Sequence, residues 1–191
     1  MAYLDDSATK IASFEGAIPY LYLDNAVPPN ATAAIGMMLP NVAASQALPW
    51  YIHDFSRAAT ANEIAQDFAR VIAMRGGMMA VQYRSDAGLS LTDTDMLSML
   101  KSELGGIDAQ LAAMYPSYSG WPEPAKLATL DMAYNLGLGE LRKGYPVFDR
   151  AANEEDWLTC SGQCHRNGPS FARNQWTAEQ FSAAYSMKVA A

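Results

Sequence analysis

Three polar side chains near the start of the 191-residue chain are of the types that could hydrolyse a glycosidic bond. They are Glu15, then Asp24 after eight intervening residues, then Thr32 after seven more. The reaction needs one carboxyl group that donates a proton to the leaving oxygen, and a second group that holds the attacking water. Glu15, between the apolar Phe14 and Ile18, is the candidate acid, whereas Asp24 can stay ionised. On spacing alone, two ordinary surface carboxylates remain the alternative interpretation.

The segments around these residues predict a short helix followed by a β-hairpin. Residues 7–14 are expected to form a helix capped at its first residue, Ser7, which leads directly to the candidate acid. Two extended runs follow, 19–24 and 32–39, joined by a turn rich in proline and asparagine. In such a hairpin the hydroxyl that opens the second strand would face the carboxylate that closes the first.

Beyond about residue 40 the sequence predicts helices. Each has a capping residue, a proline or glycine at one end, or an apolar stripe. One expected helix opens with the Thr60–Glu63 capping box, and another follows a Thr92 cap and carries Leu97, Leu100 and Leu104. The other expected helices run from Asp108 to about Tyr115, from Ala125 to Leu136, from Glu154 to Cys160, and from Thr177 to Met187, where Gln180 completes a capping box. A small β lobe with a predominantly helical body is an α+β pattern.

Composition and charge narrow the functional classes. Half of the residues are hydrophobic and 17% are charged, which is typical of a globular protein. The net charge of −7 argues against nucleic acid as a partner, since no basic stripe is available to neutralise phosphates. The apolar stretches are too short for a transmembrane helix, so membrane insertion is not expected. The first residues lack the basic and apolar regions of a secretory signal.

The two cysteines, Cys160 and Cys164, leave two possibilities open. A zinc site usually has four ligands, and His53 and His165 are the two histidines in the chain that could complete one. We therefore expect neither a metal site nor a cofactor. The pair could form one disulfide that closes a tight loop, or remain two free thiols at helical spacing.

Several stretches of the chain resemble the phage-type lysozyme (endolysin) family. Residues 14–16, 20–24 and 32–39 are similar to the family pattern, which is E-G, then a tyrosine and D, then T-x-G-x-G-H-L/M-L. Residues 131–137 resemble a family helix that ends in phenylalanine-asparagine-leucine-glycine. Residues 166–181 resemble its C-terminal helix, which carries an arginine. The matches occur in the family order and span most of the chain.

The resemblance implies a lysozyme-like α+β fold in a single domain, residues 1–191. A small β-hairpin lobe, about 15–40, would carry the catalytic residues, a helical lobe would cover 92–191, and the active-site cleft would lie between them. Residues from about 40 to 91 would be a family-variable insert. This insert is similar to those of longer bacterial lysozyme-like proteins, including bacteriocin-type and secretion-system-delivered toxins.

The activity that the resemblance implies is that of an N-acetylmuramidase, which cuts the β-1,4 bond between N-acetylmuramic acid and N-acetylglucosamine in peptidoglycan. Glu15 would protonate the leaving oxygen, and Asp24 with Thr32 would position the attacking water, which gives an inverting displacement. Among supporting residues, Arg173 would pair with Glu15, and Asn135 would line the cleft. Tyr22 is the third residue expected to support substrate binding.

This chain departs from the family pattern at three points. Ala34 stands where the family has its first glycine, and Met37 stands where it has histidine. The histidine is not part of the catalytic group, so we expect its loss to have a structural effect. The turn that contains Pro28 is longer than in the short phage enzymes, which could shift Thr32 relative to Asp24.

Two other functions are compatible with the same residues. One is a catalytically idle relative that binds glycan strands or another protein through the cleft. The other is a lytic transglycosylase, in which a lone acid acts and Asp24 and Thr32 have no catalytic role. The acidic net charge gives no long-range attraction to peptidoglycan, which carries its own carboxylates.

The implied substrate sets the expected partners and location. The partner would be the peptidoglycan glycan strand, and a delivered toxin would add an immunity protein or a secretion-system component. We expect a monomer that is made in the cytoplasm and acts, after delivery, in the periplasm or on the cell wall of a target or host bacterium. A phage lysin released through holin pores fits equally well.

Overall fold

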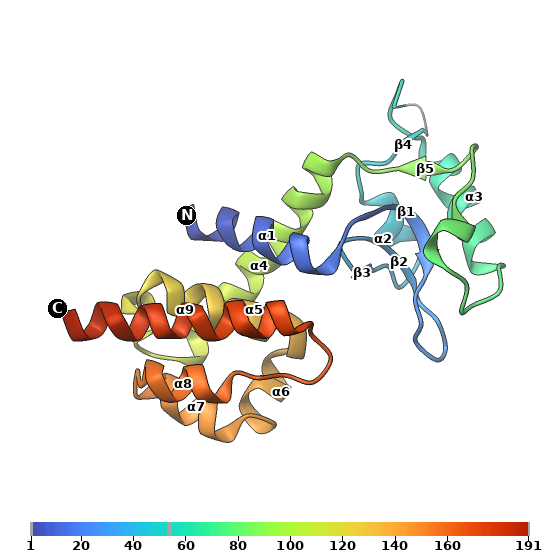
Figure 1. Ribbon diagram of the computed structural model, residues 1–191. Helices are drawn as coiled ribbons and strands as arrows, with labels where there is room; N and C mark the ends of the chain where they lie inside the picture. The colour runs from blue at the N-terminus through green and yellow to red at the C-terminus, as the bar shows by residue number, and fades with distance from the viewer. Residues whose placement is uncertain (1, 53–54, 191) are drawn as a thin grey trace. The chain divides into compact units, whose positions relative to one another are not determined.

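The computed structural model describes residues 2–52 and 55–190, so His53 lies outside the described residues. The chain divides into two units (Figure 1). The sheet unit is Glu15–Leu100, and the helical unit combines Met1–Phe14 with Lys101–Ala191. Small antiparallel sheets together with many helices agree with the predicted α+β class. Among the described residues, no helix combines the length and the apolar character needed to cross a membrane.

A three-stranded antiparallel sheet, in the order β1-β2-β3, forms part of the sheet unit. Its strands are β1 (Ile18–Leu23), β2 (Ala31–Ala34) and β3 (Met37–Met38). The single extended run predicted for 32–39 is wrong, because the chain reverses between β2 and β3. Ala34 and Gly36 both have left-handed backbones, with φ of 56° and 73°. This reversal converts the predicted two-stranded hairpin into a three-stranded meander.

The pairing of β1 with β2 fixes which side chains share a face of the sheet. Tyr22 lies opposite Thr32 and Leu23 lies opposite Ala31, with an irregularity between Ile18 and Tyr22. Because successive side chains of a strand point to opposite faces, Tyr22 and Thr32 share one face, and Leu23 and Ala31 share the other. Leu23 and Ala31 are buried.

The remaining elements of the sheet unit surround this sheet. They are α2 (Val42–Gln46), β4 (Tyr51–Ile52), α3 (Ala61–Ile72), the 3₁₀ helix η1 (Ala80–Tyr83) and β5 (Leu89–Ser90), with β4 pairing antiparallel to β5. The capping box at Thr60 and Glu63 is confirmed: the threonine side chain accepts from the Glu63 backbone N–H, and the glutamate accepts from the Thr60 N–H. α3 contacts both β1 and β2.

Most of the helices belong to the helical unit. Their bounds are α1 (Ala2–Glu15, its last residue in the sheet unit), the 3₁₀ helix η2 (Tyr118–Gly120), α5 (Glu123–Leu136), α6 (Leu138–Lys143), α7 (Pro146–Asn153), α8 (Trp157–Gln163) and α9 (Phe171–Ala190). α9 packs along α5 and α8. The core between them contains fully buried aromatic side chains, including Phe148, Trp157 and Phe181. The helix predicted at 125–136 is confirmed, whereas α6 and α7 were not predicted.

Several predicted helix boundaries are wrong, two of them for the same reason. Ser7 and Thr177 lie inside α1 and α9, where each hydroxyl donates to the carbonyl four residues earlier instead of capping the helix. The two helices expected at 93–104 and 108–115 are one continuous helix, α4 (Asp93–Met114). Gly105 and Gly106 fall within α4, since a glycine weakens a helix by only about 1 kcal/mol relative to alanine.

The two cysteines belong to the helical unit and are free thiols in the structure. Cys160 lies in α8 and Cys164 is its C-terminal capping residue. Both side chains are buried. Burial raises the pKa of Cys160 to about 12 and that of Cys164 to about 11. Of the two alternatives left open by the sequence, the structure contains the free thiols.

Candidate functional site

The candidate acid, Glu15, is the last residue of α1. Gly16 follows with φ of 75°, the left-handed conformation that commonly ends a helix and that glycine adopts without steric cost. This geometry turns the chain directly from α1 into β1. The Glu15 side chain is exposed, so its apolar neighbours Phe14 and Ile18 do not bury it.

The candidate water-positioning carboxylate, Asp24, is held by the loop that follows β1. Its Oδ1 accepts hydrogen bonds from the backbone N–H groups of Ala26 at 3.0 Å and Asn30 at 2.8 Å. Its Oδ2 accepts one from Asn30 Nδ2 at 3.0 Å. The Asp24 backbone N–H in turn donates to the Asn30 carbonyl at 3.0 Å. The loop therefore closes around this carboxylate and fixes its orientation.

These contacts determine the charge of Asp24. Partial burial raises the pKa of this carboxyl, but the hydrogen bonds from Asn30, Ala26 and Thr32 together outweigh burial and lower the pKa below its usual value. Asp24 is therefore ionised throughout the neutral range. An ionised, oriented carboxylate can accept a proton from a bound water molecule.

Thr32 lies beside this carboxylate on the same face of the sheet. It is directly opposite Tyr22 in the β1–β2 pairing, and Asp24 comes two residues after Tyr22. Its side chain is 3% exposed. The Thr32 hydroxyl donates to the Asn30 carbonyl at 3.3 Å, and its proximity to Asp24 contributes to the lowered pKa of that carboxyl. The longer turn thus leaves Thr32 near Asp24, with Asn30 bonded to both side chains.

The pKa of the Tyr22 hydroxyl responds to the charges of both Glu15 and Asp24. Partial burial raises the pKa of its hydroxyl, and the negative charges of Asp24 and Glu15 raise it further. Both carboxylates therefore lie close enough to Tyr22 to act on the same phenol. All four residues belong to the sheet unit: Tyr22, Asp24 and Thr32 lie at one end of the β1–β2 pairing, and Glu15 precedes the other end of β1.

The other two predicted site residues, Arg173 and Asn135, belong to the helical unit. Arg173 lies in α9 and is nearly buried; its Nε and one terminal nitrogen contact Asp131 Oδ1 at 2.9 and 2.8 Å. Asp131 lies one helical turn before Asn135 on α5, so the two side chains point from the same side of the helix. Asn135 is exposed. Arg173 therefore pairs with the buried carboxylate that lies one turn before the exposed Asn135 on α5.

Sequence reasoning did not assign a role to two further members of this cluster, Asp131 and Arg166. Both are fully buried. Arg166 donates to Asp131 Oδ2 at 2.6 Å and to the Asp131 carbonyl at 3.2 Å, while the Thr177 hydroxyl lies 3.0 Å from Oδ2. The available signal was an aspartate in the apolar stripe of a buried helix, because a buried charge must be paired.

The division of the chain into two units limits which of the predicted contacts the structure describes. Glu15 belongs to the sheet unit and Arg173 to the helical unit, so their pairing remains a prediction. Within residues 2–52 and 55–190, no group of three or more histidine, cysteine or carboxylate side chains could hold a metal ion. Neither a protein-family model nor a curated protein sequence matches the chain.

Proposed function

We propose that this protein is a peptidoglycan hydrolase, an N-acetylmuramidase in which Glu15 is the general acid. The observation that carries the proposal is that β1 runs from an exposed carboxyl group just before its start to an ionised, oriented carboxylate at its end, with a hydroxyl of β2 near that carboxylate. These are the three functional groups that an inverting glycosidase uses. They belong to Glu15, Asp24 and Thr32, respectively.

The proposed reaction is a single displacement at the anomeric carbon of N-acetylmuramic acid. Glu15 gives its proton to the leaving glycosidic oxygen as the bond between that oxygen and the anomeric carbon breaks. A water molecule held by Asp24 and Thr32 attacks from the opposite face, and its proton passes to Asp24. The configuration at the anomeric carbon is inverted, and the two carboxyl groups must stand apart by about 6.5–9.5 Å to admit the water.

The bonding of Asp24 favours water positioning over covalent attack. A carboxylate has about four lone-pair sites, and backbone and side-chain N–H groups of its own loop fill three of them. One site remains for the Thr32 hydroxyl or for water. A carboxylate held in this way is a poor nucleophile but a well-oriented base, which fits an inverting reaction.

The backbone of the β2–β3 reversal supports the family resemblance on which the substrate assignment rests. The family pattern has glycine at the positions of Ala34 and Gly36, and both residues have positive φ. Glycine is the residue that adopts this conformation without strain. The backbone conformation that would explain the family's glycines is thus present here, even though alanine occupies the first position.

A second candidate, a lytic transglycosylase, is compatible with the same bonds that hold Asp24. If the carboxylate serves only to close its loop, Glu15 would act alone and the 6-hydroxyl of the sugar would attack. The products would then carry 1,6-anhydro ends. Digestion of purified peptidoglycan followed by mass spectrometry separates the two candidates, because a hydrolase leaves reducing-end muramic acid.

The proposed substrate defines where the protein would act. Peptidoglycan lies outside the cytoplasm, so the enzyme would work in the periplasm or on the cell wall of a target or host bacterium, as a lysin or a delivered toxin. A delivered toxin would require an immunity protein in the producing cell. Growth inhibition on expression of the protein directed to the periplasm, relieved by Glu15→Gln, tests this part of the proposal.

A further inference from the structure

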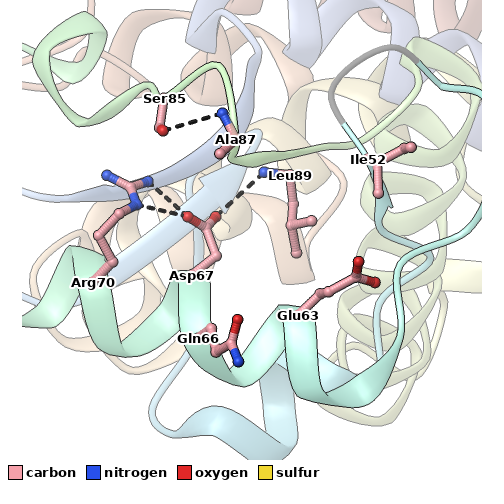
Figure 2. A pocket seen from close by; sticks show the side chains of 8 residues that line it. All are labelled: Ile52, Glu63, Gln66, Asp67, Arg70, Ser85, Ala87 and Leu89. Carbon is pink, nitrogen blue, oxygen red and sulfur yellow. Dashed lines mark hydrogen bonds and ion pairs between the residues drawn. The ribbon is translucent and has the colours of Figure 1, made fainter.

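A polar cavity lies in the sheet unit and shares no residue with the proposed catalytic group. Its volume is about 230 Å³. One face of α3 forms its floor, and the loop before β5 and the end of β4 form its walls (Figure 2). The principal lining residues are Ile52, Gln66, Asp67, Arg70, Ser85 and Leu89. The cavity therefore lies in the segment that the sequence identified as an insert of unassigned role.

The centre of the cavity holds a carboxylate in a fixed position. Asp67 is 7% exposed, and its Oδ1 contacts Nε and one terminal nitrogen of Arg70 at 2.8 and 2.7 Å. Its Oδ2 accepts a long hydrogen bond of 3.4 Å from the Leu89 backbone N–H, drawn in Figure 2. A bond of that length is weak, so Oδ2 keeps the capacity to accept a stronger one from a ligand.

Three other polar groups at the cavity have unused hydrogen-bonding capacity. Arg70 has five N–H donors, of which two contact Asp67 and one contacts the Met74 sulfur, so two remain. The Gln66 amide is exposed and makes no hydrogen bond within the described part of the chain. The Ser85 oxygen accepts from the Ala87 backbone N–H at 3.2 Å, which leaves its proton for another acceptor.

The charge of the cavity disfavours an anion. Glu63 also lines it, so two carboxylates face one arginine, and that arginine is already bonded to Asp67. Arg57 pairs with Glu63 from outside the cavity and brings the local balance to zero. Phosphate or a free carboxylate would find no unpaired cation here, whereas ligand hydroxyl groups would find an acceptor and several donors.

We propose that this cavity binds one N-acetylhexosamine residue of a glycan chain. Its hydroxyl groups would donate to Asp67 Oδ2, its acetamido group would pair with the Gln66 amide, and its methyl group would contact Ile52 and Leu89. The volume is below the range of about 300–1,000 Å³ for drug-sized ligands, which suits a single sugar ring. The choice of an N-acetylated sugar rests on the proposed function, and the cavity would hold the strand at a distance from the bond being cut.

The test is a titration of the full chain with N-acetylglucosamine, followed by the NMR signals of ¹³C-labelled methyl groups. We expect saturable shifts of the Ile52 and Leu89 methyl signals in the millimolar range. Gln66→Ala should weaken this binding at least tenfold. Asn62→Ala, an exposed position on the same helix outside the cavity, should leave it unchanged. If Gln66→Ala alters the fold, Ser85→Ala provides an independent test and should also weaken the binding of N-acetylglucosamine.

Several results would overturn the proposal. The Ile52 and Leu89 signals could fail to shift, the Gln66 and Ser85 variants could bind as the wild type does, or inorganic phosphate or glycine could produce the larger effect. The titration does not depend on catalysis, and the Glu15→Gln variant should show the same methyl shifts. Failure of the proposed hydrolysis would instead appear as undigested peptidoglycan with the titration intact.

Discussion

Tyr22 and Thr32 lie directly opposite each other in the pairing of β1 with β2, and Asp24 continues the same face. This register has a functional consequence, because a slip of one residue would turn the Thr32 hydroxyl to the other face of the sheet. The loop that Asp24 closes with Asn30 fixes the register from one end. The residues proposed for catalysis are thus positioned by strand pairing and by a loop that one of them organises.

Asp24 should make the stability of the protein depend on pH in the acid range. Its pKa is lowered in the folded state, so its stabilising contribution is present above the pKa of the unfolded chain and is lost as the pH falls through the lower folded value. Asp24→Asn should flatten the decline in the free energy of unfolding below about pH 4. Urea denaturation between pH 2 and 7 measures this.

Asp86→Asn is the matched control for that experiment. Asp86 is an exposed carboxylate of the same unit that makes no hydrogen bond among the described residues. Its substitution should leave the acid dependence as in the wild type. An Asp24→Asn profile that follows the wild type at every pH would contradict the assigned role of the loop.

The left-handed backbone at Ala34 predicts an unusual response to glycine. Ala33 and Ala34 are neighbouring buried alanines of β2, and each would lose a methyl group on replacement by glycine. Ala34 alone has positive φ, which costs a non-glycine residue about 1–2 kcal/mol. Ala34→Gly should therefore be less destabilising than Ala33→Gly by about 1–2 kcal/mol. Equal free energies of unfolding for the two variants would exclude the strain.

The buried ion cluster in the helical unit should be essential to its stability. Among the described contacts, Asp131 is the carboxylate that forms ion pairs with both Arg166 and Arg173. Asp131→Ala leaves buried guanidinium groups without this partner, and such losses cost about 3–5 kcal/mol. Guanidinium denaturation should show a loss of this size. Asp6→Ala, at an exposed position in the same unit, should change the free energy of unfolding by no more than about 0.5 kcal/mol.

The thiols should be unreactive while the protein is folded. Cys160 and Cys164 are 0% and 1% exposed, and burial raises the pKa of each well above neutrality. The thiolate is the reactive form, so neither should react with Ellman's reagent at pH 8. Two thiols should react once the protein is unfolded in guanidinium chloride. Rapid reaction of the native protein, or no reacting thiol after unfolding, would contradict the structure.

The elements that the sequence predicted well are those with a local signal. The Thr60–Glu63 capping box and the apolar stripe of 125–136 each depend on contacts within a few residues, and both helices form. The α+β class follows from the same patterns. Chemical type and local spacing also selected Glu15, Asp24 and Thr32, which lie within 18 residues of one another in the chain, and their catalytic role stays a prediction.

The sequence failed where tertiary contacts override local preferences. Thr177 looks like a helix cap, but Asp131 from α5 lies against its hydroxyl and α9 continues past it on both sides. Ala34 has no local tendency toward positive φ, and the reversal into β3 imposes it. The roles of Asp131 and Arg166 depend on a pairing 35 residues apart, which spacing alone cannot reveal.

The rate at which Glu15→Gln digests purified peptidoglycan tests the central claim most directly. The substitution keeps the size and removes the transferable proton, so the rate should fall by about 10²–10⁴-fold. Glu154→Gln, an exposed glutamate of the helical unit, should retain the wild-type rate. Full activity of Glu15→Gln, or the absence of reducing-end muramic acid among the products of the wild type, would contradict the account.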